Sequence, residues 1–83
     1  MTEDELKQIE SRVNSAKKGI WKFHLEGRDH ESGSNFIMTG IGTERDEDLE
    51  ISGATEMDYE FIANARQDIP RLIAEIRRLR GDK

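Results

Sequence analysis

The stretch from Thr55 to Gly81 decides the fold, and it reads TEMDYEFIANARQDIPRLIAEIRRLRG. Its apolar side chains recur at spacings of three, four, three, four and three residues, which is typical of a helix with one apolar seam. We call these positions the seam: Ile62, Ala65, Ile69, Leu72, Ile76 and Leu79. Phe61 and Ile73 widen the seam into a face broad enough for a globular core. The stretch therefore predicts a long C-terminal helix that carries much of the core.

A proline interrupts this pattern. Thr55 and Asp58 have the spacing of a capping box, and Gly81 suits the end of a helix. Pro70 removes one helical hydrogen bond and clashes with the preceding turn, at a cost of about 3 kcal/mol. Asp68 could cap a new helix that has the proline in its first turn. We expect helices at about 56–67 and 69–80, nearly collinear, with a kink or break between them.

The N-terminal segment has a second apolar stripe. Thr2 and Glu5 have capping-box spacing. The apolar positions then recur at helical spacing, and they are Leu6, Ile9, Val13 and Ala16. Gly19 can adopt the left-handed conformation that ends a helix. The pattern predicts a helix at about 2–18.

Between the two helices the apolar period changes to two. Trp21, Phe23 and Leu25 alternate with polar side chains, as in a strand with one buried face. The pattern predicts strands at about 20–26, 35–41 and 48–52, and their short connections favour an antiparallel meander. Residues 1–83 are therefore expected to form a single α+β domain. Its predicted order is a helix, a small three-stranded antiparallel sheet and a long C-terminal helix kinked or broken near Pro70.

Composition limits how this domain can be stabilised. Hydrophobic residues make up 34% of the 83 residues and charged residues 37%, whereas typical domains have about 45–50% and about 25%. The chain has no cysteine and therefore no disulfide. Because the core is this small, we expect the fold to be stabilised by a ligand or by assembly into a homo-oligomer. Without a long apolar run or a basic N-terminal signal, we expect no membrane association and a cytoplasmic protein.

Charge is divided unevenly along the chain. Residues 26–60 carry eleven acidic and two basic groups, whereas residues 61–83 carry six basic and three acidic groups. An acidic middle and a basic end permit self-complementary assembly, although a solvated loop and a soluble helix face explain the same pattern. The net charge of −5 disfavours binding to duplex nucleic acid.

No residue pattern indicates catalysis. Cysteine is absent, no serine lies in a nucleophile elbow, and no nucleophile–base pair can be named, so we expect no enzyme and no cofactor. Asp29, His30 and Glu31 could contribute metal ligands, but adjacent positions on an extended chain point to opposite faces. We therefore predict no metal site, and the roles of His24 and His30 stay open.

Basic groups near Pro70 suggest a binding site. A helix break would expose backbone N–H groups that favour an anion, and arginine binds phosphate or carboxylate in a bidentate manner. The predicted ligand-binding residues are Asn64, Arg66, Arg71, Phe61 and Trp21, with the aromatic rings stacking on a base. In the alternative, Arg66 pairs with Asp58 or an acidic loop residue, and the two aromatics belong to the core.

The two ends of the chain resemble a diffuse class of short phage- and prophage-borne proteins of mostly unknown function. The class has a Gly-x-Trp strand start, here Gly19-Ile20-Trp21. It also has a helix with the pattern D-x-E-F-I-A-x-A-R-x-D-x-P-x-L-x-x-E, here residues 58–75. The first motif usually reads Pro-Gly-Pro-Trp, whereas this chain has Lys18-Gly19-Ile20-Trp21. The resemblance implies a protein that acts by stoichiometric binding in the cytoplasm of a host cell.

Two hypotheses about function follow. In the first, an oligomeric, non-enzymatic phage-type protein acts in anti-defence by sequestering a small anionic ligand, such as a cyclic nucleotide immune signal. A subunit interface would complete the pocket. In the second, the chain is an acidic protein-binding inhibitor or adaptor that acts on a host or phage protein. An enzyme is the least favoured alternative.

Overall fold

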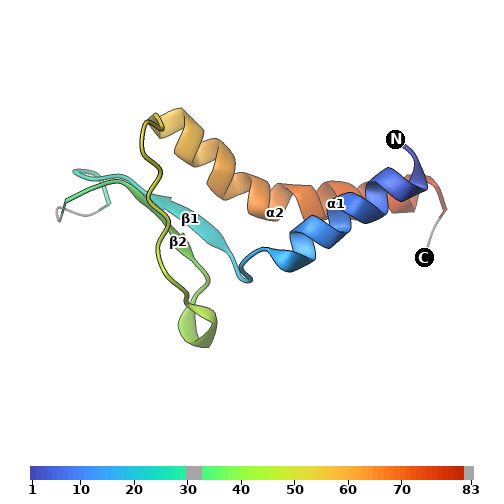
Figure 1. Cartoon of the computed structure of the whole chain (residues 1–83), viewed down its shortest axis with the longest axis horizontal. Coiled ribbons are helices and arrows are strands. Elements are labelled where there is room, and N and C mark those ends of the chain that lie inside the picture. The colour runs from blue at the N-terminus through green and yellow to red at the C-terminus, as the bar shows by residue number, and fades with distance from the viewer. Residues whose placement is uncertain (30–32, 82–83) are drawn as a thin grey trace.

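The computed structural model describes residues 1–29 and 33–81 and confirms an α+β chain (Figure 1). Helix α1 spans Glu3–Ser15 and helix α2 spans Glu56–Leu79. Between them lie strand β1 (Trp21–His24), strand β2 (Phe36–Thr39) and the 3-10 helix η1 (Gly42–Glu44). The first half of α2 covers the β-hairpin, and α1 runs antiparallel beside the second half of α2. The molecule is elongated, with extents of 47 × 28 × 18 Å.

Both helices begin where the sequence predicts. The Thr2 hydroxyl accepts a hydrogen bond from the Glu5 amide at 3.2 Å, and the Glu5 carboxylate accepts one from the Thr2 amide at 2.8 Å. Thr55 and Asp58 form the same reciprocal pair at 3.1 and 3.0 Å. These boxes satisfy amide groups that a helix N-terminus otherwise leaves without partners.

The first helix ends earlier than predicted, at Ser15 rather than near Lys18. Ala16 already has an extended backbone. The chain then turns at Gly19, which has a φ of +91° and lies so close to Gly40 that a Cβ atom would overlap the Gly40 backbone. The close approach of these two glycines brings the end of α1 against the end of β2. Gly19 therefore shapes the turn after the helix instead of capping the helix.

The predicted break at Pro70 is wrong, because α2 is one helix through residues 56–79 instead of two helices at 56–67 and 69–80. Figure 1 shows α2 changing direction near its middle, as a proline kink does. Ala63 before the proline and Ile73 after it are both buried. Their packing offsets the cost of about 3 kcal/mol for an internal proline. Asp68 consequently lies within a helix and caps nothing.

The sheet has two antiparallel strands, and the three-stranded sheet is not confirmed in the described residues. Phe23 pairs with Ile37 across the hairpin. The segment predicted as a third strand at 48–52 makes only an isolated bridge between Leu49 and Ile37. The Asp46 amide also donates a hydrogen bond to the Thr39 carbonyl at 2.9 Å. Between this bond and the Leu49–Ile37 bridge, the segment therefore advances three residues while β2 advances two. The extra residue interrupts the ladder as a β-bulge does.

The core lies between the hairpin and the first half of α2. It consists of Phe23, Ile37, Tyr59 and Ala63. The Phe23 and Tyr59 rings stack with centroids 5.0 Å apart and planes at 9°. The Tyr59 hydroxyl accepts a hydrogen bond from the Ile51 amide at 2.8 Å, which ties the irregular segment after β2 to α2.

The face of α2 that packs on the sheet overlaps the seam only at its edge, where Ile62 packs against the core. Tyr59, Ala63 and Ile73 are its buried residues, whereas Phe61, Leu72 and Leu79 are 75%, 60% and 71% exposed. The alternative that places Phe61 in the core is therefore not confirmed. The seam is only partly buried: Ile62, Ala65 and Ile76 are half-buried, whereas Leu72 and Leu79 are exposed. Much of the strongest apolar pattern in the sequence is left on the surface of the chain.

Candidate functional site

An open groove of about 310 Å³ lies between α1 and α2. Its α1 wall contains Ile9 and Val13, whose spacing of four residues places both side chains on one face of that helix, and Ala16, just after the helix, extends this wall. Arg12 from the same helix also lines the groove and is exposed. Trp21, the first residue of β1, is a further lining residue.

The α2 wall combines half of the seam with its two neighbours. Ile62, Ala65 and Ile69 are the seam residues of this wall, and Phe61 and Arg66 complete it. Among the α2 residues that line the groove, Phe61 is the most exposed, and most of its ring faces solvent. The described lining thus contains two guanidinium groups and no carboxylate.

Trp21 and Arg66 are held by one backbone carbonyl. The Lys17 carbonyl accepts a hydrogen bond from Trp21 Nε1 at 3.2 Å and another from Arg66 Nε at 2.9 Å. Lys17 lies two residues beyond the end of α1, so its carbonyl takes no part in the hydrogen-bond pattern of the helix. The indole and the guanidinium are therefore positioned before any ligand arrives.

Gln67 fixes the backbone of β1 at the same end of the groove. Its side-chain oxygen accepts from the Trp21 amide at 2.9 Å, and its Nε2 donates to the Trp21 carbonyl at 3.1 Å. These two bonds occupy strand-edge groups that would otherwise be open to pairing. They also fix the position of Trp21 relative to α2.

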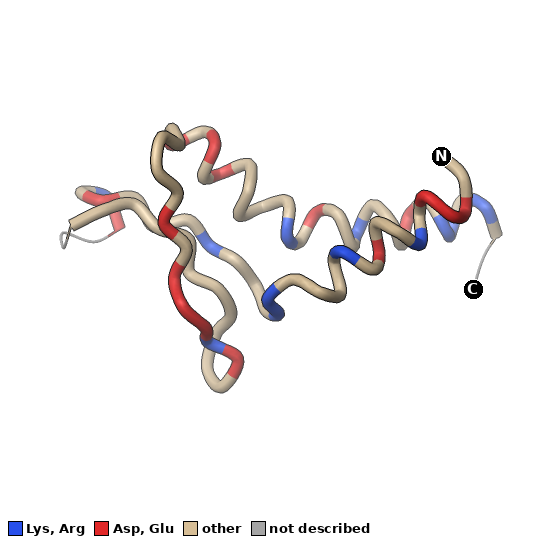
Figure 2. The backbone as a smooth tube through the Cα atoms, in the orientation of Figure 1, with Lys and Arg blue, Asp and Glu red and all other residues tan. Residues whose placement is uncertain are grey.

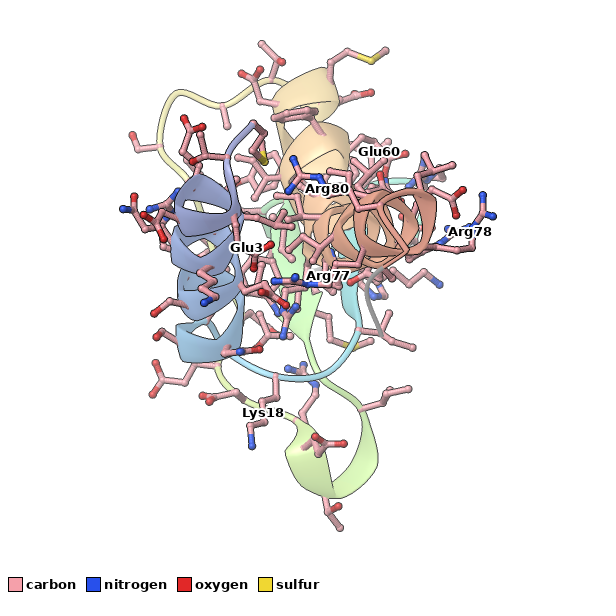
Figure 3. All side chains as sticks on the ribbon, turned by 90° about the vertical axis from the view of Figure 1, so that its right-hand side faces the viewer. Glu3, Lys18, Glu60, Arg77, Arg78 and Arg80 are labelled. Carbon is pink, nitrogen blue, oxygen red and sulfur yellow. The ribbon has the colours of Figure 1, made fainter. Side chains whose placement is uncertain are left out.

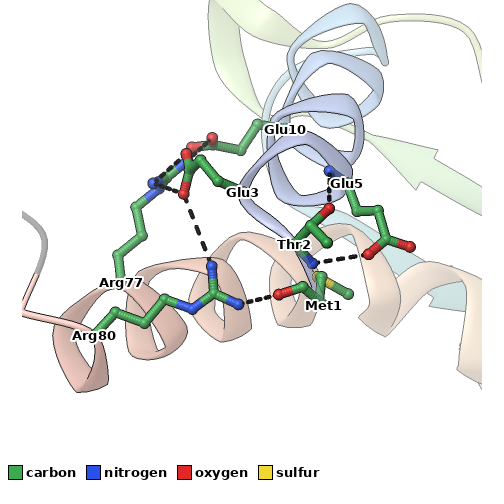
Figure 4. Close-up of polar contacts among 7 residues, drawn as sticks. All are labelled: Met1, Thr2, Glu3, Glu5, Glu10, Arg77 and Arg80. Carbon is green, nitrogen blue, oxygen red and sulfur yellow. Dashed lines mark hydrogen bonds and ion pairs between the residues drawn. The ribbon is translucent and has the colours of Figure 1, made fainter.

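Ion pairs hold the two walls together at the other end of α1 (Figure 4). Arg77 bridges Glu10 and Glu3, with 3.1 Å between its Nη1 and Glu3 Oε2. The hydrogen bonds to Glu10 and then to Glu3 raise the pKa of Arg77 above its usual value. Figure 3 shows Arg77 pointing toward α1, whereas Arg78 points away from it. Leu6, on the same helix as the two glutamates, is fully buried.

The structure brings together three of the five predicted ligand-binding residues. Trp21, Phe61 and Arg66 line the groove. Asn64 is exposed and donates to the Glu60 carbonyl at 2.8 Å, and Arg71 lines a separate surface hollow with Asp68, Leu72 and Glu75. Because α2 is continuous, Pro70 does not begin a helix with free N–H groups, and the anion site predicted there is not formed in that way.

Neither alternative partner predicted for Arg66 matches the hydrogen bond that holds it. Its Nε binds the Lys17 carbonyl rather than Asp58 or an acidic loop residue. Sequence reasoning also missed Arg12 and Gln67 as site residues. Arg12 immediately precedes Val13 in the N-terminal stripe, so its position was a usable signal, whereas nothing in the sequence marks Gln67.

Acidic groups gather away from the groove, in the segment after β2 (Figure 2). Lys17 Nζ lies 3.2 Å from Asp46 Oδ1, and Arg45 pairs with Asp48 at 2.7 Å. The Glu47 amide and then Lys17 lower the pKa of Asp46. In the described part of the chain, no group of three or more potential ligands could hold a metal ion. His30 and Glu31 lie outside the described residues.

Comparisons with protein-family models, with curated proteins and with solved structures find no match for the chain. Among residues 1–29 and 33–81, no helix has both the length and the apolar character needed to cross a membrane. The groove geometry is therefore the basis for a functional assignment.

Proposed function

We propose that the chain is a non-enzymatic binding protein that takes an apolar, acidic helical segment of another protein into the groove between α1 and α2. The observation that carries this proposal is the lining, in which apolar side chains surround Arg12 and Arg66 and no acid is present. An amphipathic helix buries its apolar face in such a groove, and its acidic flank pairs with the guanidinium groups.

The exposed ring of Phe61 supports a macromolecular ligand. Large aromatic side chains that enter a partner's pocket supply much of the affinity of protein interfaces. The groove is open to solvent instead of closed over a buried cavity, which suits a segment of a larger partner. The chain would then act as an inhibitor or adaptor. The resemblance to phage proteins suggests a host or phage protein as the target, in the host cytoplasm.

A nucleotide immune signal is the second candidate ligand. The positioning of Trp21 and Arg66 on the Lys17 carbonyl favours it, because an aromatic ring and a guanidinium suit a base and a phosphate. Only three of the five residues predicted for this role line the groove, and the lining is dominated by apolar groups. The protein ligand therefore accounts for more of the site.

Isothermal titration calorimetry distinguishes the two candidates. One probe is a synthetic amphipathic helical peptide of leucine and glutamate, and its matched control replaces every glutamate with lysine. The other probes are a panel of cyclic and linear nucleotides. We expect one-to-one binding of the acidic peptide and no binding of the lysine peptide. Binding of a nucleotide with no response to either peptide would overturn the proposal in favour of the second candidate.

A further inference from the structure

The seam of α2 has a spacing that reads the same in both directions. Its six residues follow at three, four, three, four and three positions, so the pattern is symmetric about the junction of Pro70 and Arg71. Two copies of α2 in antiparallel contact would therefore match every seam residue with another. In that arrangement Ile76 of one copy lies opposite Ala65 of its partner.

The charges of α2 favour the same direction. Residues 56–60 carry three acidic groups and no basic group, and residues 77–80 carry three arginines and no acidic group. Within the chain Arg77 and Arg80 pair with Glu3, and Arg78 pairs with Glu75. Antiparallel contact adds each acidic end to this arginine cluster of the other copy, whereas parallel contact would bring like charges together. The helix is thus complementary to itself in one direction only.

The chain also exposes more surface than its size requires. Its accessible surface is 6101 Å², whereas a compact folded chain of this mass exposes about 5,100 Å². Its radius of gyration is 15.1 Å, against about 12 Å for a compact domain of this length. The excess of about 1,000 Å² is comparable to the roughly 800 Å² that each partner buries in a standard interface. Leu72 and Leu79, more than half exposed, contribute to it.

We propose that α2 of a second copy packs antiparallel on the seam, whose Leu72 and Leu79 are exposed and whose Ile62, Ala65 and Ile76 are half-buried, and forms a two-fold symmetric dimer. Because Ile62, Ala65 and Ile69 belong both to the seam and to the groove, the second copy covers the α2 wall of the groove. Self-association therefore competes with a target segment, and this regulatory consequence, unlike the dimer itself, rests on the proposed function. The dimer also supplies the stabilisation that a chain without cysteine lacks.

Sedimentation velocity over a range of concentrations tests the dimer. We expect the mass of two chains at high concentration and of one chain on dilution. Leu72→Glu, at a position 60% exposed, should weaken the dimer at least about 30-fold. Ile41→Glu is the matched control, because Ile41 is 57% exposed and lies outside the seam. Leu79→Glu is a second disrupting variant, and circular dichroism verifies that each variant folds. A wild-type monomer at all concentrations overturns the inference.

Cysteine cross-linking tests the direction in a chain that has no native cysteine. Antiparallel contact predicts that Ala65→Cys protein mixed with Ile76→Cys protein forms mixed disulfide dimers. Neither variant alone should cross-link, because the paired sites would lie about 17 Å apart along the helix axis. Cross-linking of either variant with itself, and not with the other, overturns the antiparallel arrangement.

The two proposals can fail separately. A protein that stays monomeric yet binds the acidic peptide contradicts the dimer and supports the binding function. A chain that dimerises at high concentration but does not bind the acidic peptide at dilutions where it is monomeric supports the dimer and contradicts both the binding function and its regulation.

Discussion

Replacement of Phe61 by alanine should weaken binding strongly while leaving the fold intact. Phe61 is 75% exposed, and with roughly 200 Å² of side-chain surface it offers a partner about 150 Å². At about 25 cal/mol per Å², complete burial of that area would contribute at most about 4 kcal/mol. We therefore expect the acidic peptide to bind with a dissociation constant raised by about 30-fold to 1,000-fold.

The same substitution should hardly change stability. The buried quarter of the Phe61 ring corresponds to about 50 Å², or about 1 kcal/mol of folding free energy. Alanine recovers part of this through its higher helix propensity, by about 0.5 kcal/mol. Phe23→Ala is the matched contrast, because Phe23 is only 4% exposed, and its loss should cost about 3–5 kcal/mol.

Calorimetry with the acidic peptide and urea unfolding followed by circular dichroism measure the two effects. If Phe61→Ala lowered the free energy of unfolding as much as Phe23→Ala, Phe61 would belong to the core and the assignment of the exposed face would fail. If the variant bound the peptide as tightly as wild type, the groove would not be the binding site.

Three further substitutions test the interactions that stabilise the fold around the groove. Tyr59→Phe leaves the Ile51 amide without its acceptor, so urea unfolding should show a loss of about 1–3 kcal/mol. Pro70→Ala restores a helical donor, and thermal unfolding should show an increase in stability of up to about 3 kcal/mol. Asp29 has its pKa lowered from 3.8 to about 2, first by the hydrogen bond from Arg28. Its stabilising contribution is therefore complete above pH 3.8 and is lost as the pH falls toward 2. Melting temperatures measured across that interval should depend less on pH in Asp29→Asn than in wild type.

The sequence predicted the local structure well where the interactions are local. The capping boxes at Thr2 and Thr55 join residues three positions apart, so their spacing is sufficient to locate both helix starts. Alternation of Trp21 and Phe23 likewise depends only on the geometry of one strand. These features need no knowledge of what packs against them.

Tertiary packing decided the features that the sequence did not predict. Pro70 favours a break by itself, but buried residues on both sides of it keep α2 continuous. The third strand failed because an extra residue before Leu49 interrupts its ladder. The seam is apolar enough for a core, and only the structure shows that Tyr59 and Ala63 are the buried core residues of the first half of α2, with the seam residue Ile62 packed at the edge.

The site was predicted in part for the same reason. Trp21, Phe61 and Arg66 are recognisable by residue type, and they meet because the chain turns after α1. Gln67 was missed because its role depends on the edge of a strand forty-six positions away in sequence. Asn64 and Arg71 were chosen for a helix break that does not form.

Fluorescence of Trp21 tests the central claim most directly, because it is the single tryptophan and it lines the groove. On titration with the acidic amphipathic peptide, burial of the indole should shift its emission to shorter wavelength and saturate at one peptide per chain. The lysine counterpart should leave the emission unchanged. A calorimetrically verified binding event without any change in Trp21 emission would place the ligand outside the groove and contradict the account.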